Sequence, residues 1–596
     1  MSLSDPTGTD VSGPRPHLLR RGLDWTVSVL PLLGLAAVVY LVGWPHTLET
    51  EQVLVASMRW VAGLYAALFL AHWWLQPRRE EASPWGRYAF PLLAVVILLG
   101  ALFDGLISQW VHQEVQQLPA RVILLTLAAL QQVVAAAMRL ASWIPAFEST
   151  VLRRVNPGTI LFGTFALLIV FGTLLLKLPN ATVGQLGWLD ALFTSTSAVC
   201  VTGLIVVDTA TAFTPLGQGI ILLLIQMGAF GIVTLTFFLA VVTGQGFSVA
   251  SRVFLRDVLN LENLRNLGTA IYFLIFCTLA IELTGAAALY FFWSQSGGEA
   301  VPDLWWASLF HSVSAFCNAG FSIFSTGLAD PRTAFNYPVQ AVIMGLIVLG
   351  GIGFPVLLEA LGLFRRIFGP AAKGRFTVHF RLVLLSTAIL IVGGALALWA
   401  SEWRAASDTW LHQAWVALFN SVTARTAGFN ITDMAALSSA ATAVMILLMF
   451  IGGSPGGFAG GIKTTTFALA MLNLRRILLA RGDVELFGRR IDEEFCNRAF
   501  AVLLLSLTWI FGATTLILFL QPSFTLLDTL FETVSAFSTV GLTRGITPEL
   551  SGASKLVIIA TMFVGRVGVM NFFFSLLVIP PKDRHSRLPR ERIIIE

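Results

Sequence analysis

The sequence predicts an all-α integral membrane protein in which four N-terminal transmembrane helices precede four similar units. The first observation is composition, because 56% of the 596 residues are hydrophobic and only 12% are charged, against about 25% charged in an ordinary soluble domain. The second is roughly a dozen apolar runs of the length, about 20 residues, that a helix needs to cross a bilayer. The third is a short apolar motif that recurs four times in the second part of the chain.

The N-terminal part is expected to form a cytoplasmic tail, residues 1–23, and a four-helix transmembrane region, residues 24–157. The tail ends in the basic stretch RPHLLRRG, and no small-residue cleavage site follows the first apolar run. An uncleaved first span is therefore favoured over a signal peptide. No arginines recur at every third residue, which favours a packing bundle over a voltage sensor. The apolar runs are 25–44, 53–75, 88–111 and 119–141.

From residue 158 the chain repeats a unit made of a long apolar run, a short apolar run, a glycine and a second long run. Each short run reads Leu-Phe-x-Ser/Thr-x-Ser/Thr-Ala and leads to a glycine, at spacings of 108 to 117 residues. A fourfold match at a near-constant period indicates an internal repeat. The glycines are Gly203, Gly320, Gly428 and Gly541. The units are assigned to 158–248, 249–363, 364–478 and 479–580, followed by a cytoplasmic tail, 581–596.

The loops between the units predict one orientation for all of them. The segments that join one unit to the next, such as FRRIFGPAAKGRFTVHFR, are rich in Lys and Arg and belong inside by the positive-inside rule. The segments ahead of the short runs, such as KLPNATVGQLGW, are poor in basic residues and belong outside. Each unit therefore begins and ends inside, so the four are parallel repeats related by an axis along the membrane normal.

The first short run, from about Trp188 to Val199, is too short to cross a bilayer, and both its flanks are expected outside. A chain that enters and returns is tolerated only where it is buried in protein or lines a water-filled path. Four such loops can meet on one axis, where a ring of backbone carbonyls would replace the hydration shell of a cation. Glycine suits such a turn because it adopts backbone angles that other residues avoid. The predicted fold is four parallel repeats of span, pore helix, filter loop and span around one pore.

The loop sequences resemble the selectivity filters of the Trk, Ktr and HKT potassium transporter superfamily, and KtrB-type membrane subunits most closely. They read SAVCVTGL, SAFCNAGF, TARTAGF and SAFSTVGL, and the ending RLPRERIIIE is similar too. The resemblance covers about 158–596 and leaves the role of the N-terminal spans open. Glycine in all four filters fits the K⁺-selective members, whereas some plant relatives carry serine in the first filter and pass mainly Na⁺.

This resemblance implies K⁺ uptake across the cytoplasmic membrane through a gated, K⁺-selective, channel-like pore. It also implies a homodimer, and a cytoplasmic nucleotide-binding regulatory ring of the KtrA or TrkA kind on the basic loops and tail. Na⁺ as an activator is left open. The selectivity filter is assigned to Cys200, Val201, Thr202, Gly203, Cys317, Asn318, Ala319, Gly320, Arg425, Thr426, Ala427, Gly428, Ser538, Thr539, Val540 and Gly541. K⁺ is assigned to the backbone carbonyls of Val201, Thr202, Asn318, Ala319, Thr426, Ala427, Thr539 and Val540.

Residues 452–466, GGSPGGFAGGIKTTT, nearly match a phosphate-binding loop. Gly456 and Gly461 have its spacing, but Ile462 separates the second glycine from Lys463. Apolar runs lie on both sides, so the stretch is expected to interrupt the second span of the third unit. In the resembled family such a loop closes the path below the filter. The gate is assigned to Gly452, Gly453, Gly456, Gly457, Gly460, Gly461, Lys463, Thr464 and Arg566.

Three arginines lie in or next to the predicted filter and spans, where a charged side chain requires a partner or a function. Arg425 lies in the third filter segment, and two alternatives remain: an ion pair with Glu532 of the next unit, or bonds to nearby carbonyls only. Arg566 interrupts the last span, where the resemblance implies an arginine in the pore that acts as an electrostatic barrier or gate partner. Arg544 follows the fourth filter and either lowers the cation concentration at the mouth or points away from it.

Two other classes of protein are weighed. A membrane-embedded enzyme needs convergent His, Asp or Cys side chains. The eight histidines are scattered and the four cysteines form no CxxC pair, so neither enzymatic activity nor a metal centre is expected. A Na⁺- or H⁺-coupled secondary transporter is the alternative function. It is less favoured because such transporters use helices broken at the midplane.

Overall fold

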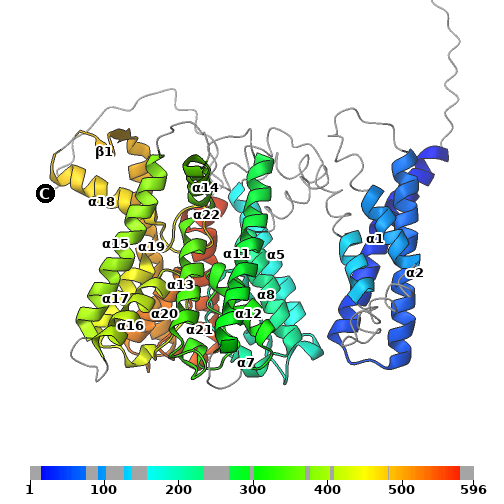
Figure 1. The fold of residues 1–596 in the computed structure, drawn as a ribbon, viewed down its shortest axis with the longest axis horizontal. Helices are drawn as coiled ribbons and strands as arrows, with labels where there is room; N and C mark the ends of the chain where they lie inside the picture. Colours follow the sequence, from blue (N-terminus) through cyan, green and yellow to red (C-terminus); the bar gives the residue numbers. More distant parts are fainter. Residues whose placement is uncertain are drawn as a thin grey trace, which may run out of the picture.

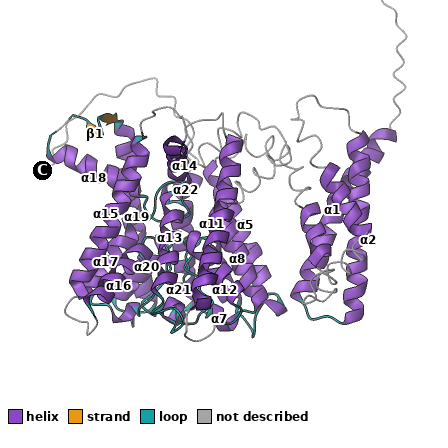
Figure 2. Cartoon of the chain, in the orientation of Figure 1, coloured by secondary structure: helices purple, strands orange, loops and turns teal. Residues whose placement is uncertain are grey.

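The computed structural model describes residues 15–75, 91–102, 126–136, 157–231, 267–295, 301–368, 376–402, 409–480 and 482–576. The regular secondary structure of this part of the chain is helical apart from one small hairpin, and loops connect the helices (Figure 2). Five helices in it are long and apolar enough to span a membrane, and a bent pair makes a sixth. The five spans are Leu48–Ala71, Gly158–Leu176, Ile271–Gln295, Val378–Glu402 and Glu493–Leu520.

The N-terminal region forms a group of helices at one side of the repeat units (Figure 1). Helix α1 (Arg15–Gly43) packs against α2 (Leu48–Leu75). Helix α1 begins at Arg15, inside the segment 1–23 that was expected to be a tail. A proline in the first turn of a helix is compatible with this start. Shorter helical segments cover 91–102 and 126–136, so the third and fourth expected spans lie partly outside the described residues. The group meets the first unit where Asn180 donates to the Val42 carbonyl at 3.1 Å.

Each repeat unit consists of an outer helix, a short helix and an inner helix. In the first unit these are α5 (Pro157–Leu176), α6 (Trp188–Val199) and α8 (Pro215–Phe230). In the second they are α11 (Leu267–Gln295), α12 (Leu304–Phe316) and α13 (Tyr337–Ile352), continued by α14 (Phe354–Phe368). In the third they are α15 (Val378–Glu402), α16 (Trp410–Thr423) and α17 (Ser439–Phe450), continued by α18 (Thr464–Leu478). In the fourth they are α19 (Glu493–Leu520), α20 (Leu526–Phe537) and α21 (Gly552–Val567), continued by α22 (Val569–Leu576).

Smaller elements connect these helices. The hairpin strands are β1 (Val484–Leu486) and β2 (Arg489–Ile491), which pair antiparallel. Phe487 and Gly488 both have positive φ, as a two-residue hairpin turn requires. Only a basic connector was expected here, because three-residue strands carry almost no periodic signal. The single helical turns are α7 (Thr209–Ala212), η2 (Pro179–Ala181), η4 (Gly327–Ala329), η5 (Met434–Ala436) and η6 (Thr547–Glu549).

The four units stand side by side with the same orientation. The short helices α12, α16 and α20 lie toward one end of the molecule, and α14, α18 and β1 lie at the other (Figure 1). The phenylalanine of the Leu-Phe motif anchors every short helix, since all four are fully buried. These residues are Phe193, Phe310, Phe419 and Phe531.

The sequence predicts an interrupted inner helix in the third unit, and the structure shows interruptions in the second and fourth units too. In the first unit α8 ends at Phe230, one residue before the described residues stop. Helices α8, α13 and α21 each end at a glycine of positive φ, and α14 leaves α13 at an angle of 99°. These glycines are Gly231, Gly353 and Gly568. The further interruptions, in the second and fourth units, were not predicted from the sequence. The missed signal is a repeated Gly-x-x-Gly: GAFG, GGIG and GRVG.

The first glycine of each Gly-x-x-Gly allows the inner helix to pack against the short helix of the same unit. A Cβ on Gly228 would lie 1.9 Å from the carbonyl oxygen of Val199, the last residue of α6. The matching distances are 1.8 Å from Gly350 to Phe316 and 1.8 Å from Gly565 to Phe537. Only glycine fits so close to a carbonyl, which places the end of each of these inner helices against the end of its short helix.

Candidate functional site

The four short helices lead into loops of the same backbone conformation, here called the glycine loops: residues 200–203, 317–320, 425–428 and 538–541. In each, the glycine has positive φ, and so does the residue two positions before it. The latter are Val201, Asn318, Thr426 and Thr539, with φ of 57°, 58°, 68° and 50°. Three of these are β-branched, for which positive φ is a genuine outlier. Strain of this kind is retained at functional sites.

The glycine loops meet one another in a closed ring. A Cβ added to any of the four glycines would collide with the backbone carbonyl of the residue before the next glycine in the ring. The separations from the Cβ position to that oxygen are 2.3 Å from Gly203 to Ala319, 2.7 Å from Gly320 to Ala427, 2.2 Å from Gly428 to Val540 and 2.2 Å from Gly541 to Thr202. The fourth unit returns to the first, so the loops surround a single axis. The structure thus brings together the residues that the sequence assigned to one filter.

The second hydroxyl of the Ser/Thr-x-Ser/Thr motif holds each glycine loop in shape. In the first and fourth units it accepts from the glycine N–H, at 3.0 Å for Ser197 and 3.2 Å for Ser535. In the second and third it donates to the carbonyl of the residue after the glycine, at 2.8 Å for Ser314 and 2.6 Å for Thr423. The motif is visible in the sequence, but these roles of its hydroxyls are not.

The first hydroxyl of the motif fastens each short helix to its outer helix. Ser195 donates to Ile169 at 2.7 Å, Ser312 to Glu282 at 2.6 Å and Ser421 to Ile391 at 2.8 Å, each at a backbone carbonyl. In the fourth unit Thr533 instead shares a 2.7 Å hydrogen bond with the Thr514 hydroxyl. The motif therefore encodes two separate attachments, one for the helix and one for the loop.

Replacing Ser535 with alanine is expected to loosen the fourth glycine loop. The Gly541 N–H loses its partner in a buried place, which costs about 1–3 kcal/mol. We expect a lower thermal unfolding temperature in detergent and a several-fold loss of cation flux. Ser294→Ala is the matched control, because this exposed hydroxyl bonds only to the Phe291 carbonyl of its own helix. Equal behaviour of the two variants would exclude the role given to Ser535.

Arg425 does not pair with Glu532, so the predicted ion pair is wrong. Its guanidinium donates to the backbone carbonyls of Thr387, at 3.4 Å, and Gly452, at 3.1 Å. Glu532 instead accepts from the hydroxyls of Thr543, at 2.8 Å, and Thr547. The alternative, bonding to carbonyls only, is confirmed. The chain from Phe to Gly is one residue shorter in the third unit than in the others, and Arg425 joins its glycine loop to the outer helix and to the 452–466 loop.

The 452–466 loop closes on itself at the break in the third inner helix. The N–H of Gly452 donates to the Ile462 carbonyl at 2.9 Å, and Ile451 and Ile462 form a bridge. Gly456 and Gly461 have positive φ, which permits the two turns. Within the loop, Lys463 Nζ donates to the Ala459 carbonyl at 2.5 Å. Thr464 and Ser454 share a 3.0 Å hydroxyl contact, so the loop has a defined conformation of its own.

The same loop packs against the other units. A Cβ on Gly460 would lie 1.9 Å from the Thr539 hydroxyl, in the fourth glycine loop. Ser454 and Phe458 donate their N–H groups to carbonyls at the end of α13, those of Gly351 and Gly350, at 2.9 and 3.2 Å. The Phe458 ring also meets Phe230 of the first unit edge to face at 5.7 Å. Gly453 and Gly457 are also close-packed, with their Cβ positions 2.3 Å from the Ala459 Cβ and 3.0 Å from the Gly350 carbonyl oxygen.

Arg566 joins three units through its guanidinium. It donates to the Phe458 carbonyl in the 452–466 loop and, at 3.0 Å, to the Gly228 carbonyl in α8. Arg566 itself belongs to α21 of the fourth unit. The sequence assigned Arg566 and this loop to one site without a contact between them, and the structure supplies that contact.

Glu282 and Cys317 of the second unit form a buried polar contact with Gln226 of the first. Glu282 accepts from the Gln226 amide at 3.1 Å, a hydrogen bond that joins α11 to α8. The Cys317 thiol contacts the same pair. Asp104 lies outside the described residues. The part of the chain that the structure describes contains no group of three or more His, Cys, Asp or Glu placed to bind a metal ion.

Four units that each contain a helix long and apolar enough to span a membrane, and that each bring a glycine loop to one ring, define a multi-pass membrane transporter. The chain belongs to the TrkH family of cation transport proteins, whose family model matches residues 131–588. This membership confirms the predicted superfamily and the prediction that the chain is not an enzyme.

Curated relatives and a solved structure agree with the family. The chain is 37% identical over 436 residues to Ktr system potassium uptake protein B of Bacillus subtilis, covering 71% of this chain and 93% of that protein. It is 34% identical over 460 residues to potassium/sodium uptake protein NtpJ of Enterococcus hirae, covering 75% and 99%. The crystal structure of the potassium transporter TrkH from Vibrio parahaemolyticus has the same fold, with a TM-score of 0.59, 17% identity, and coverage of 88% of this chain and 98% of that one.

Proposed function

We propose that this chain takes up K⁺ across the cytoplasmic membrane through one K⁺-selective pore bounded by the glycine loops. Ring closure carries the proposal, because a carbonyl of each loop lies against the glycine of its neighbour. The alternating sign of φ turns successive peptide planes so that their carbonyls can face the same side. Such oxygens can replace the hydration shell of K⁺. The proposed ligands are the carbonyls of Val201, Thr202, Asn318, Ala319, Thr426, Ala427, Thr539 and Val540.

The electrostatics around the ring favour a cation. Every glycine loop starts at the C-terminal end of a short helix, where the helix dipole places partial negative charge. The one basic side chain in the loops, Arg425, is engaged by carbonyls of α15 and the 452–466 loop. The membrane potential then drives uptake, at about 2.3 kcal/mol per charge per 100 mV.

The 452–466 loop and Arg566 are proposed as the gate below the filter. The loop belongs to the third unit and contacts the fourth glycine loop, the end of α13 in the second unit and Phe230 in the first. A movement of the loop would therefore change contacts in every unit. Arg566 holds it through the Phe458 carbonyl and brings a positive charge to membrane depth, where charges face protein or water. A closed pore is the state that these contacts favour.

We also propose a homodimer controlled by a cytoplasmic nucleotide-binding ring. Support comes from the relatives named as proteins of a Ktr system and from basic residues at the end of the molecule that holds α18 and the hairpin (Figure 1). These include Arg475, Arg476, Arg489 and Arg490.

A coupled secondary transporter remains the second candidate, and the glycine breaks in the inner helices favour it, since such transporters use broken helices. The closed ring of parallel units favours the pore. Uptake of K⁺ into proteoliposomes driven by a membrane potential alone, without a Na⁺ or H⁺ gradient, is expected for the pore and not for the coupled transporter. The same assay with added Na⁺ tests whether Na⁺ activates uptake.

The proposed selectivity is tested by comparing K⁺ and Na⁺ flux through the wild type and Gly203→Ser. A side chain at Gly203 must displace the Ala319 carbonyl, which lies 2.3 Å from the Cβ position. We expect the wild type to prefer K⁺, and the variant to lose about tenfold of that preference, equivalent to about 1.4 kcal/mol. Equal K⁺ and Na⁺ flux through both proteins would exclude a K⁺-selective pore.

A further inference from the structure

Neighbouring units touch at an equivalent place on the loop side of the ring. The contact joins the fourth residue of one inner helix to the start of the next short helix. Between the first and second units, Trp306 donates its indole N–H to Gln218 at 2.9 Å. Between the second and third, Trp415 donates to Gln340 at 2.6 Å. Both tryptophans lie four residues before the motif phenylalanine, so the two junctions use the same device.

Each glutamine also forms hydrogen bonds within its own unit. The Gln340 amide donates to the carbonyls of Thr333 and Ala334, at 3.0 and 2.8 Å. The Gln218 amide reaches the carbonyls of Thr209 and Phe213, both at 3.5 Å. Each glutamine therefore ties the segment after its own glycine loop to the next unit.

The junction between the fourth and first units uses an ion pair instead. Lys555, the fourth residue of α21, donates to Asp190 at 2.7 Å. Asp190 lies three residues before the motif phenylalanine of α6. Asp528 has the same place in α20, which predicts a cation opposite it, but the fourth residue of α17 is Thr442. The threonine side chain carries no charge to pair with this aspartate.

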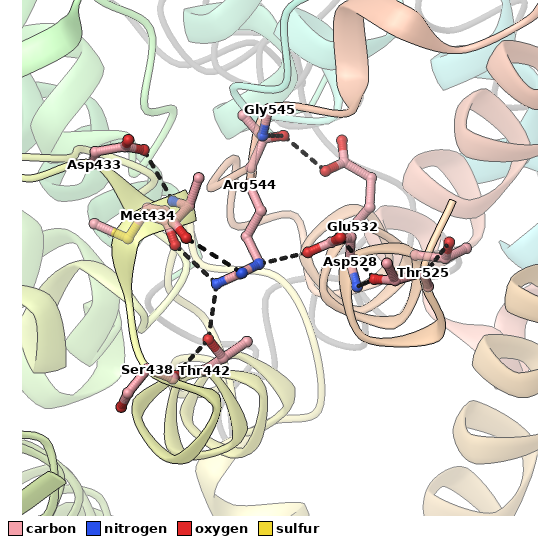
Figure 3. A network of polar contacts seen from close by, with 12 residues as sticks. Asp433, Met434, Ser438, Thr442, Thr525, Asp528, Glu532, Arg544 and Gly545 are labelled. Carbon is pink, nitrogen blue, oxygen red and sulfur yellow. Dashed lines mark hydrogen bonds and ion pairs between the residues drawn. The ribbon is translucent and has the colours of Figure 1, made fainter. Parts of the chain in front are cut away.

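Arg544 fills that gap, from the segment just after the fourth glycine loop. Its Nε donates to Asp528 at 2.6 Å and its Nη1 to the Thr442 hydroxyl at 2.8 Å. Its guanidinium also donates to the carbonyls of Met434 and Ala435, at 3.0 and 3.3 Å. Figure 3 shows the arginine between these two groups of residues, which belong to the third and fourth units. One guanidinium thus replaces both the glutamine amide and the lysine.

We propose that Arg544 is a positioning residue that keeps the third and fourth glycine loops in contact and so maintains ion selectivity. This deepens the proposed function and rests on it. Arg544 follows Gly541 by three residues. The two loops already touch, with the Gly428 Cβ position 2.2 Å from the Val540 carbonyl. Loss of the contact would let the ring open at this junction.

The same contacts argue against a role for Arg544 as a charge barrier at the mouth. Its side chain is 13% exposed and paired with Asp528. A carboxylate at 2.6 Å offsets the guanidinium charge toward an approaching cation. The two roles predict different outcomes for substitutions that keep or remove the charge.

Arg544→Lys and Arg544→Gln separate the two roles in proteoliposomes. Lysine keeps the charge but cannot reproduce the planar fork of donors. A positioning role predicts that both variants lose K⁺ preference over Na⁺, by about tenfold, because charged hydrogen bonds at the junction are lost. A barrier role predicts that Arg544→Lys has the flux and ion preference of the wild type, and that Arg544→Gln has a raised flux of both ions. The latter pattern would overturn the proposal.

A rebuilt junction tests the proposal by rescue. The rebuilt variant copies the arrangement between the first and second units, where the equivalent residues are Gln218, Trp306 and Ala307. It adds three substitutions to Arg544→Gln: Thr442→Gln, Leu527→Trp and Asp528→Ala. The K⁺ preference is expected to return toward the wild type. Arg332→Gln is the matched control, since that arginine forks onto Asp330 of its own unit, at 2.6 and 2.7 Å. Failure of the rebuilt junction to recover any preference would count against the positioning role.

A measurement independent of transport separates this proposal from the proposed function. Amide hydrogen exchange over residues 538–545 is expected to rise in Arg544→Lys and to fall back in the rebuilt variant, whichever ion passes. Unchanged exchange in Arg544→Lys would refute the positioning role. A wild type without K⁺ preference would contradict the proposed function, while the exchange result would still decide the role of Arg544.

Discussion

Gly428→Ala is expected to abolish measurable K⁺ flux and to leave a folded but altered ring. The added methyl would lie 2.2 Å from the Val540 carbonyl, one of the proposed ligands, and 3.2 Å from the Cα of Gly541. Both neighbours are backbone atoms of the fourth glycine loop, so no flexible side chain can move aside. The positive φ of 79° adds a further penalty, about 1–2 kcal/mol for a non-glycine residue.

Gly488→Ala separates the collision from the backbone penalty. Gly488 has a φ of 74° in the hairpin turn, but no atom lies within 4 Å of its Cβ position. It should therefore suffer the same conformational cost and retain K⁺ flux. Size-exclusion profiles and flux are to be measured on both variants. Normal flux and normal K⁺ preference in Gly428→Ala would contradict the closed ring of glycine loops.

Arg566→Gln is expected to raise K⁺ flux by about tenfold or more, because two effects add. A unit charge 4 Å from a cation costs about 4 kcal/mol at an effective dielectric constant near 20, and each 1.4 kcal/mol is tenfold in rate or affinity. The substitution also removes the hydrogen bonds to Phe458 and Gly228 that hold the 452–466 loop in place.

Arg566→Lys distinguishes these two effects. Lysine keeps the charge and loses the forked contacts. If the charge and the contacts both restrict K⁺ flux, the flux through Arg566→Lys is expected to lie between that of the wild type and that of Arg566→Gln. Arg498→Gln serves as the control, since this arginine is 65% exposed and pairs only with Glu494 one turn away. Flux through Arg566→Gln at or below the wild-type level, in protein that elutes normally, would refute the gate assignment.

Much of this architecture follows from local patterns that the sequence displays openly. The Leu-Phe-x-Ser/Thr motif and the glycine that follows it mark every short helix and loop, because helix length, burial and turn conformation are all local requirements. The parallel arrangement follows from the basic loops. What the motif could not reveal is the division of labour between its two hydroxyls, since the partners of Ser195 and Ser197 lie on different elements.

The errors have a common physical cause. Of the two alternatives for Arg425, the ion pair with Glu532 is wrong, because the guanidinium donates to the carbonyl of Thr387 and to that of Gly452, at the break in the third inner helix. The breaks in the second and fourth inner helices were not predicted, because an apolar run has the same sequence pattern whether the helix is straight or bent. The repeated Gly-x-x-Gly was the available signal. The partners of Arg544, more than 100 residues away at Met434 and Thr442, could not be found from spacing at all.

The most direct test of the central claim is to locate a bound K⁺ analogue. Crystals of the protein soaked in Tl⁺ should give anomalous difference peaks on the axis enclosed by residues 201–203, 318–320, 426–428 and 539–541. Excess K⁺ should compete with these peaks, and the same concentration of Na⁺ should leave them unchanged. Peaks confined to other parts of the molecule, or equal competition by Na⁺ and K⁺, would contradict a K⁺-selective pore bounded by the four glycine loops.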